Sequence, residues 1–266
     1  MRIQIVDAFT DRPFAGNPAG VVILDRFPAA SWMQQVAAEV NLSETAFAHP
    51  LDPSGPADFA LRWFTPAVEV ALCGHATLAT AHVLSRPGTV RFATQSGVLT
   101  ATAGEAGAYT LDFPTAPLTP VEADPRLASV LGADIVSMHH TGPSTDDLLV
   151  ELPSEQSVRD LAPDLSALAR FTHRGVVVTA AAQTPDASYD FVSRFFGAAA
   201  GVAEDPVTGS AHTALTPFWS ARLGGRTVMT GYQASARGGY VRVELKGDRT
   251  LLTGEAVTVM RGELLP

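Results

Sequence analysis

Two stretches of this chain are small-residue, largely apolar runs that we predict to be helical, and each is entered through a turn that contains glycine. The first follows Cys73-Gly74-His75 and runs from Ala76 to Leu84, with no charged residue before Arg86. The second runs from Ala211 to Leu223, after Thr208-Gly209-Ser210. A helix that is apolar on every face belongs in a core. We therefore expect each helix to lie at the centre of its own domain.

The order of elements around these helices is repetitive. Each half of the chain carries several strand-like segments, then one such helix, then further strands. Pro114, Pro117 and Pro120 mark the best candidate linker between the halves. The repeat predicts two similar domains, each wrapping a sheet around its central helix, with both helix N-termini facing a shared cleft.

Three local predictions concern the boundaries of single elements. We expect Ser31 to cap a short amphipathic helix that ends at Val40. We expect Pro217 to kink the second central helix or to shift its start, because proline lacks the N–H of a helix interior. Near the end of the chain, Leu251 to Val259 is predicted to form a single strand.

Composition narrows the classes of function. The chain has 266 residues, of which 46% are hydrophobic and 17% charged, so it supports a packed core. Its net charge of -9 and its lack of basic runs argue against nucleic-acid binding. The single cysteine, Cys73, excludes an intramolecular disulfide. Neither a signal peptide nor an apolar stretch near the ~20 residues of a membrane span is evident, so we expect a cytoplasmic protein without a membrane partner.

The usual cofactor motifs are absent from the sequence. Its seven histidines form no His-Glu-x-x-His motif, and no cysteine cluster exists, so no metal site is predicted. Neither a dinucleotide-binding glycine motif nor a Walker loop occurs. Ser210 lies in Thr-Gly-Ser-Ala-His, which differs from the Gly-x-Ser-x-Gly elbow of a hydrolase. The one lysine, Lys246, lies in a late strand that suits no Schiff base. We predict chemistry without a cofactor.

Three titratable residues remain as candidates for acid–base chemistry. Glu44 interrupts an apolar strand, where burial would raise its pKa; alternatively it faces solvent on an edge strand. His75 handles a proton or a ligand, or it is a structural cap residue. Asp205 precedes the start of a helix for which Thr208 is the expected N-cap. The open amides at that helix start, together with the helix dipole, favour binding of a carboxylate or phosphate. An ordinary capped helix is the alternative there.

Five motifs, spread in order over nearly the whole chain, resemble the PhzF-like phenazine-biosynthesis family. They are Asp7-Ala-Phe-Thr10, Phe14-Ala-Gly-Asn-Pro-Ala-Gly-Val-Val22, Asn41-Leu-Ser-Glu-Thr-Ala-Phe47, Leu72-Cys-Gly-His-Ala-Thr77 and Glu204-Asp-Pro-Val-Thr-Gly-Ser-Ala-His212. The resemblance implies an α+β fold of the diaminopimelate epimerase type, with two pseudo-symmetric domains. Each would be a mostly antiparallel sheet or barrel around a central helix, with the site between them. We place the N-terminal half at residues 1–116, completed by the last strand at about 256–266, and the C-terminal half at 117–255.

The same resemblance implies an activity and roles for site residues. The best-known reaction of the family is the isomerisation of trans-2,3-dihydro-3-hydroxyanthranilate, without metal or organic cofactor, so we expect a small carboxylated, cyclic substrate. Glu44 matches the proton-shuttling carboxylate, which needs a raised pKa to accept and then release a proton. The substrate contacts would come from His75, Asp205, Ser210 and the amides of Gly74 and Gly209. A homodimer is implied as well.

Two further hypotheses remain open. Cys73 stands where true diaminopimelate epimerases carry one of two catalytic thiols, and Asp205 stands at the opposite place. An amino-acid racemase or epimerase that uses Cys73 and Asp205 is therefore one alternative, although Cys73 could also be a small buried residue. The other alternative is a member of the fold that binds a small molecule or a protein without catalysis. Asn17, within the second motif, is a further candidate site residue.

Overall fold

The computed structural model describes residues 1–171, 173–184 and 187–265, and the chain divides into two compact units. Unit 1 comprises Met1–Phe113 and Leu251–Pro266, of which Pro266 lies outside the described residues. Unit 2 comprises Pro114–Thr250. Each unit combines a mixed sheet with few helices, so the predicted α+β class is confirmed. None of the described helices is long and apolar enough to span a membrane.

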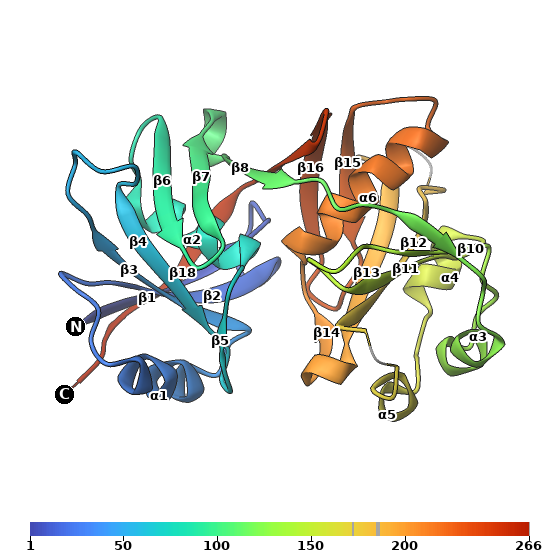
Figure 1. The fold of residues 1–266 in the computed structure, drawn as a ribbon, viewed down its shortest axis with the longest axis horizontal. Coiled ribbons are helices and arrows are strands. Elements are labelled where there is room, and N and C mark those ends of the chain that lie inside the picture. The colour runs from blue at the N-terminus through green and yellow to red at the C-terminus, as the bar shows by residue number, and fades with distance from the viewer. Residues whose placement is uncertain (172, 185–186, 266) are drawn as a thin grey trace. The chain divides into compact units, whose positions relative to one another are not determined.

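Unit 1 is a curved sheet that surrounds one helix (Figure 1). Its elements are β1 (Arg2–Ala8), β2 (Asn17–Ile23), α1 (Ala30–Val40), β3 (Glu44–Pro50), β4 (Phe59–Phe64), β5 (Glu69–Val70), α2 (Gly74–Leu84), β6 (Thr89–Thr94), β7 (Gly97–Ala103), the 3₁₀ turn η1 (Glu105–Gly107), β8 (Tyr109–Pro114), β17 (Arg249–Gly254) and β18 (Ala256–Glu263). Two of these strands, β8 and β17, cross the boundary to unit 2. The strands pair in the order β18, β1, β2, β3, β4, β6, β7 and β8. The β2–β3 and β4–β6 pairs are parallel and the others are antiparallel.

The central helix of unit 1 is α2, as its composition predicts. The strand β18, at one end of the pairing order, and β7, next to the other end, both contact it, together with β1, β2 and β3, so the sheet curls around it. Every residue from His75 to Ala81 is buried. The buried hydroxyls of Thr77 and Thr80 donate to carbonyls one turn earlier, at 2.5 and 2.7 Å, which satisfies them inside an apolar core. On the outer side of the sheet, α1 packs Met33 and Ala37 against β3 and β4.

Unit 2 repeats this design with its own helix. Its elements are β9 (Thr119–Val121), α3 (Pro125–Leu131), β10 (Ser137–His140), β11 (Asp147–Glu151), α4 (Glu155–Arg159), α5 (Leu165–Leu168), β12 (Gly175–Ala181), β13 (Phe191–Gly197), η2 (Ala198–Ala200), β14 (Val202–Asp205), α6 (Gly209–Arg222), β15 (Val228–Gln233) and β16 (Gly239–Lys246). The strands pair in the order β9, β10, β11, β12, β13, β15 and β16, and β14 also pairs with β13. The β11–β12 and β13–β15 pairs are parallel.

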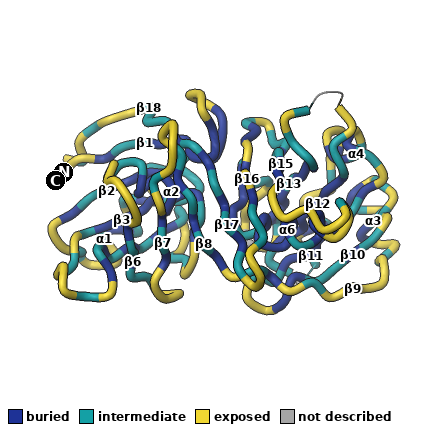
Figure 2. Tube along the Cα trace, turned by 90° about the horizontal axis from the view of Figure 1, so that it is seen from above, coloured by how far each residue is buried: buried dark blue, intermediate teal, exposed yellow. Residues whose placement is uncertain are grey.

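The sheet of unit 2 has helices on both sides. Within its curve lies α6, which contacts β11, β15 and β16. Outside, α3, α4 and α5 bury Leu127, Val158 and Leu168 against a valine-rich face of β11 and β12. The strands β11 and β12 carry consecutive apolar residues, Leu148–Val150 and Val176–Val178. Consecutive apolar residues are typical of strands that are covered on both faces. Figure 2 shows the exposed residues mainly on the turns between strands and on the outer helices.

Two boundary predictions, for Ser31 and for residues 251–259, are wrong, and a third holds in part at most. The helix α6 starts at Gly209 and continues through Pro217, so Pro217 does not shift its start, and a kink stays a prediction. The carbonyl that Pro217 leaves without an intrahelical partner, that of Thr213, accepts the amide of Ala116 at 3.2 Å. The first helix begins at Ala30, with Ala29 rather than Ser31 at its N-cap. Residues 251–259 belong to two strands, β17 and β18, which are separated at Glu255, whose carbonyl accepts the amide of Thr10 at 3.2 Å.

Candidate functional site

A cluster of sequence-predicted residues lies where three elements of unit 1 begin. Asn17 is the first residue of β2, Glu44 is the first residue of β3, and His75 is the second residue of α2. Because β2 and β3 are parallel, with Ala19 opposite Glu44, both strands begin at the same edge. The strand β3 pairs on both sides, with β2 and β4. Glu44 is therefore not on an edge strand, and its side chain is 19% exposed.

His75 connects the other two side chains. Burial lowers the pKa of His75 to about 3, so the ring is neutral near pH 7. The amide nitrogen of Asn17 lies 3.2 Å from Nδ1, and an amide NH₂ is a donor, so Nδ1 accepts. The ring proton then belongs to Nε2, which lies 3.2 Å from Oε2 of Glu44. The angles of this last contact are outside hydrogen-bond geometry, so these two atoms lie in contact without a hydrogen bond between them.

Cys73 lies at the same helix start. It is the N-cap residue of α2, is 6% exposed, and its Sγ lies 3.5 Å from Nδ1 of His75. No side chain caps the first amides of α2, which include that of Gly74. The start of α2 thus places a thiol, an imidazole and uncapped helix amides together, beside the positive end of the helix dipole.

A loop with left-handed backbone positions Asn17. Phe14 and Gly16 have φ angles of 66° and 64°, and the Phe14 amide donates to Oδ2 of the buried Asp7 at 2.7 Å. A Cβ at Gly16 would lie 2.1 Å from the carbonyl oxygen of Ala8. Only glycine fits there, because a Cβ would overlap the Ala8 carbonyl, and the positive φ is unfavourable for any other residue.

The predicted residues of unit 2 lie at the start of α6. Thr208 occupies the N-cap position, but its hydroxyl donates to Oδ2 of Asp205 at 2.5 Å and caps no helix amide. Gln233 fixes the turn, because it accepts the Thr208 amide at 2.8 Å and donates to the Asp205 carbonyl at 2.8 Å. The first helix amides, at Gly209 and Ser210, therefore have no side-chain cap.

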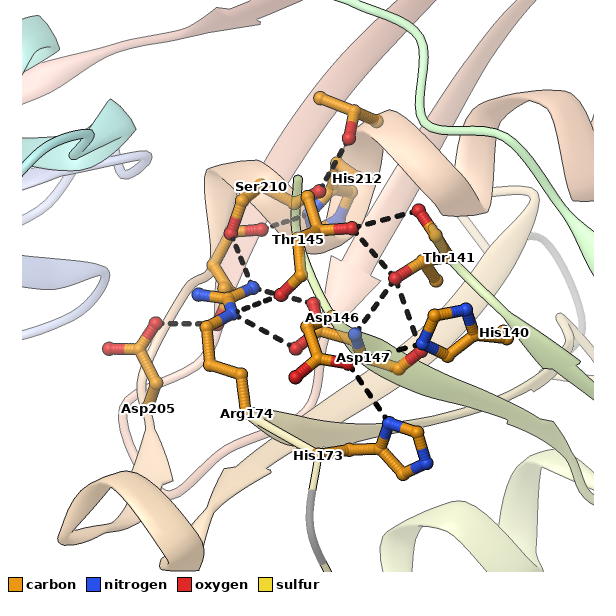
Figure 3. Close-up of polar contacts among 12 residues, drawn as sticks. His140, Thr141, Thr145, Asp146, Asp147, His173, Arg174, Asp205, Ser210 and His212 are labelled. Carbon is orange, nitrogen blue, oxygen red and sulfur yellow. Dashed lines mark hydrogen bonds and ion pairs between the residues drawn. The ribbon is translucent and has the colours of Figure 1, made fainter. Parts of the chain in front are cut away.

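An ion pair beside Ser210 was missed by sequence reasoning (Figure 3). Arg174 donates from Nε and Nη2 to the two carboxylate oxygens of Asp147, at 3.0 and 2.5 Å, and from Nη2 to Oγ of Ser210 at 3.0 Å. Asp147 is fully buried. Burial raises its pKa to about 6, although Arg174 acts to lower it. Charged residues at the starts of two buried strands were the available signal, and the parallel register, with Asp147 opposite Gly175, joins them.

Two groups among the described residues place three metal-binding side chains within reach of one ion. They are Glu44, Cys73 and His75 in unit 1, and His140, Asp146 and His173 in unit 2. In the first group both ring nitrogens of His75 already face partners, Asn17 and Glu44. In the second group each histidine has one ring nitrogen 3.1 Å from the same oxygen of Asp146.

The chain as a whole is similar to known proteins. The family model described as phenazine biosynthesis-like protein, PhzC-PhzF, matches residues 6–262. An uncharacterised isomerase of Pseudomonas aeruginosa is 48% identical over 264 residues, which are 97% of this chain and 96% of that protein. An uncharacterised isomerase of Halalkalibacterium halodurans is 45% identical over 271 residues, 99% of this chain and 98% of that protein. The crystal structure of a PhzF-family protein from Enterococcus faecalis matches with a TM-score of 0.91 and 40% identity, over 100% of this chain and 99% of that one.

Proposed function

Since the chain belongs to the phenazine biosynthesis-like (PhzC-PhzF) family, we propose that it is an isomerase that moves a proton within one substrate molecule. The substrate is a small carboxylated ring compound of the trans-2,3-dihydro-3-hydroxyanthranilate kind. Glu44 is the general acid–base, and the reaction uses no organic cofactor. The isomerase names of two relatives over 40% identical along nearly their whole length support the reaction class.

The observation that carries this proposal is the contact between Glu44 and a neutral, buried His75. A carboxylate that takes a proton and returns it must be held in place without a fixed positive charge, which would stabilise its ionised form too strongly. His75 is an uncharged neighbour of this kind, because its ring is neutral and its Nε2 lies 3.2 Å from Oε2 of Glu44. Asn17 holds the ring in this tautomer.

The proposed reaction needs only a proton transfer in each direction. Glu44, ionised at the start, takes a proton from the ring carbon that bears the hydroxyl group. The substrate then carries a delocalised negative charge, and Glu44 returns a proton to another ring position. Protons and electrons balance, because substrate and product are isomers. Asp205, Gly209 and Ser210 stay predicted substrate contacts, together with Gly74.

The test is the substitution Glu44→Gln, assayed with trans-2,3-dihydro-3-hydroxyanthranilate. Loss of a general acid–base lowers turnover by about 10²–10⁴-fold, so we expect a fall of that size in kcat with an unchanged circular dichroism spectrum. Glu39→Gln, which makes the same chemical change at an exposed position of α1, is the matched control. Full turnover by Glu44→Gln would show that Glu44 is not the proton carrier.

One contact favours a second candidate, an amino-acid racemase or epimerase. Cys73 Sγ lies 3.5 Å from Nδ1 of His75, beside the uncapped first amides of α2, and a helix N-terminus stabilises a thiolate. This alternative predicts that an amino-acid substrate incorporates solvent deuterium at Cα and that Cys73→Ser abolishes the exchange. The isomerase proposal predicts no such exchange with any amino acid. A binding protein without catalysis would turn over neither class of compound.

A further inference from the structure

Two histidines and an aspartate meet at one end of the sheet of unit 2. His140 is the last residue of β10, Asp146 directly precedes β11, and His173 lies two residues before β12. The antiparallel β10–β11 and parallel β11–β12 pairs bring these three positions to the same end of adjacent strands. Figure 3 shows both rings directed at Asp146. Nε2 of His140 and Nδ1 of His173 each lie 3.1 Å from Oδ1 of this carboxylate.

These distances suit a bound metal ion. The three donor atoms lie within 4.8 Å of one another. Ligands that surround an ion at about 2.1 Å are separated by roughly 3.0–3.4 Å, from octahedral to tetrahedral geometry. An ion can therefore enter this group with only small movements of the side chains. Two backbone hydrogen bonds hold Asp146 in place, since its amide donates to the Gly142 carbonyl and its carbonyl accepts the Arg174 amide, both at 2.8 Å.

The group is also accessible to solvent. The side chains of His140 and His173 are each 29% exposed and that of Asp146 is 48% exposed. Both histidines line a cavity of about 560 Å³, together with Leu127, Met138 and Phe171. Three protein ligands leave at least one coordination position for water or a small ligand, as in catalytic rather than structural zinc sites.

We propose that His140, Asp146 and His173 bind a late first-row divalent transition metal ion, such as Zn²⁺ or Co²⁺. Two imidazoles and a carboxylate select these ions over Mg²⁺ and Ca²⁺, which prefer all-oxygen sites. The site is separate from the Glu44 group and goes beyond the proposed isomerase activity, for which it is not required.

Metal binding would break one hydrogen bond of His140, and NMR can detect this loss. The Gly142 amide donates to Nδ1 of His140 at 3.3 Å, so the proton of the neutral ring lies on Nε2. A metal ion on Nε2 moves that proton to Nδ1, where it opposes the amide hydrogen. The Gly142 amide must then release the ring, and its NMR resonance reports the event.

The experiment titrates the tag-free full chain, stripped with EDTA, with Co²⁺ by visible absorption and with Zn²⁺ by calorimetry. We expect one equivalent of Co²⁺ to give d–d bands without a thiolate charge-transfer band, and Zn²⁺ to shift the Gly142 amide resonance. His173→Ala and Asp146→Asn should each weaken binding more than about tenfold, since even second-shell partners contribute 10–100-fold. Asparagine tolerates the left-handed backbone at position 146, so that variant keeps the turn.

Two control variants and three outcomes decide the proposal. His49→Ala removes a histidine of unit 1, Cys73→Ser removes the thiol of the other group, and both should bind the metal as the parent does. Binding that survives His173→Ala and Asp146→Asn overturns the proposal. Binding that is lost in Cys73→Ser places the ion at the Glu44 group and overturns it equally. So does the absence of any Co²⁺ or Zn²⁺ binding at millimolar metal.

Discussion

His75 and Asp147 show what burial does to single titratable side chains in this protein. Burial lowers the pKa of His75 to about 3 and raises that of Asp147 to about 6. In both cases burial favours the neutral form of the side chain, because taking a charge out of water costs free energy. His75 therefore stays uncharged over the whole physiological range, with its Nε2 at 3.2 Å from Oε2 of Glu44. Asp147 differs because Arg174 pairs with it through two hydrogen bonds and opposes the effect of burial.

The raised pKa of Asp147 predicts a pH-dependent contribution to stability. Its pKa rises from 3.8 to about 6 on folding, so the folded state binds the proton more tightly. The contribution is complete below about pH 4 and is lost as pH rises to about 6. Because Asp147→Asn removes this titration, the free energy of unfolding of the parent relative to the variant should fall by about 1–3 kcal/mol over that range. Urea denaturation at both pH values measures it.

A suitable control for this measurement is Asp160→Asn. Asp160 is an exposed aspartate of the same unit, so other effects of pH on the unit are shared. A difference between parent and Asp147→Asn that stays constant from pH 4 to 6 would contradict the prediction.

Among the elements, the loop between β1 and β2 has a conformation that is fixed by three features of its backbone. Its positive φ angles, its anchor on Asp7 and its close approach at Gly16 together determine where β2 begins. Since β2 begins with Asn17, the partner of His75, the loop conformation also sets the orientation of the imidazole. A structural change in this loop should therefore reach His75 and its contact with Glu44.

We predict that Gly16→Ala destabilises the protein by about 2–4 kcal/mol. A left-handed alanine costs about 1–2 kcal/mol, and overlap with the Ala8 carbonyl adds to this. Gly88→Ala separates the two effects, because Gly88 also has a positive φ of 76° but has no atom within 4 Å of a Cβ. The stability of Gly88→Ala should therefore fall only by the about 1–2 kcal/mol that a left-handed alanine costs. Thermal unfolding measures both, and equal losses would show that the close approach carries no cost.

The elements divide clearly into those that sequence predicts and those it does not. The helices α2 and α6 were predictable because their burial requires small, apolar residues on every face. The effect of Pro217 was not, because the amide that compensates for it belongs to Ala116, about a hundred positions earlier. The Asp147–Arg174 pair and the His140–Asp146–His173 group were missed for a related reason. Their members are separated along the chain, and only strand register brings them together.

At the scale of the whole molecule, the two units differ in how the chain builds them. Unit 2 is one continuous segment with its own core, whereas unit 1 is formed from two segments. The second segment supplies β18, which pairs with β1 along Arg2–Ala8 and contacts α2 (Figure 1). Without it, β1 would lose one of its two neighbours and α2 part of its cover.

This asymmetry predicts different behaviour for the two isolated pieces. A fragment of residues 114–250 should fold alone and unfold cooperatively in urea, since a continuous unit with its own core can do so. A fragment of residues 1–113 should not, because its central helix lacks β18. Near-ultraviolet circular dichroism and urea titration of each fragment test this. Cooperative unfolding of residues 1–113 alone would contradict it, and adding residues 251–265 through a short linker is the rescue control.

The pairing of β1 with β18 has a consequence for folding during translation. Domains usually fold in the order in which the ribosome makes them, N-terminal first. Here β1 is synthesised before unit 2, but its partner β18 emerges only after all of unit 2. The nascent chain must therefore carry an unfinished first unit, with an unpaired strand edge, while the second unit is being made. An unpaired edge favours aggregation, so the period in which a chaperone can act on this protein is set by the synthesis of unit 2.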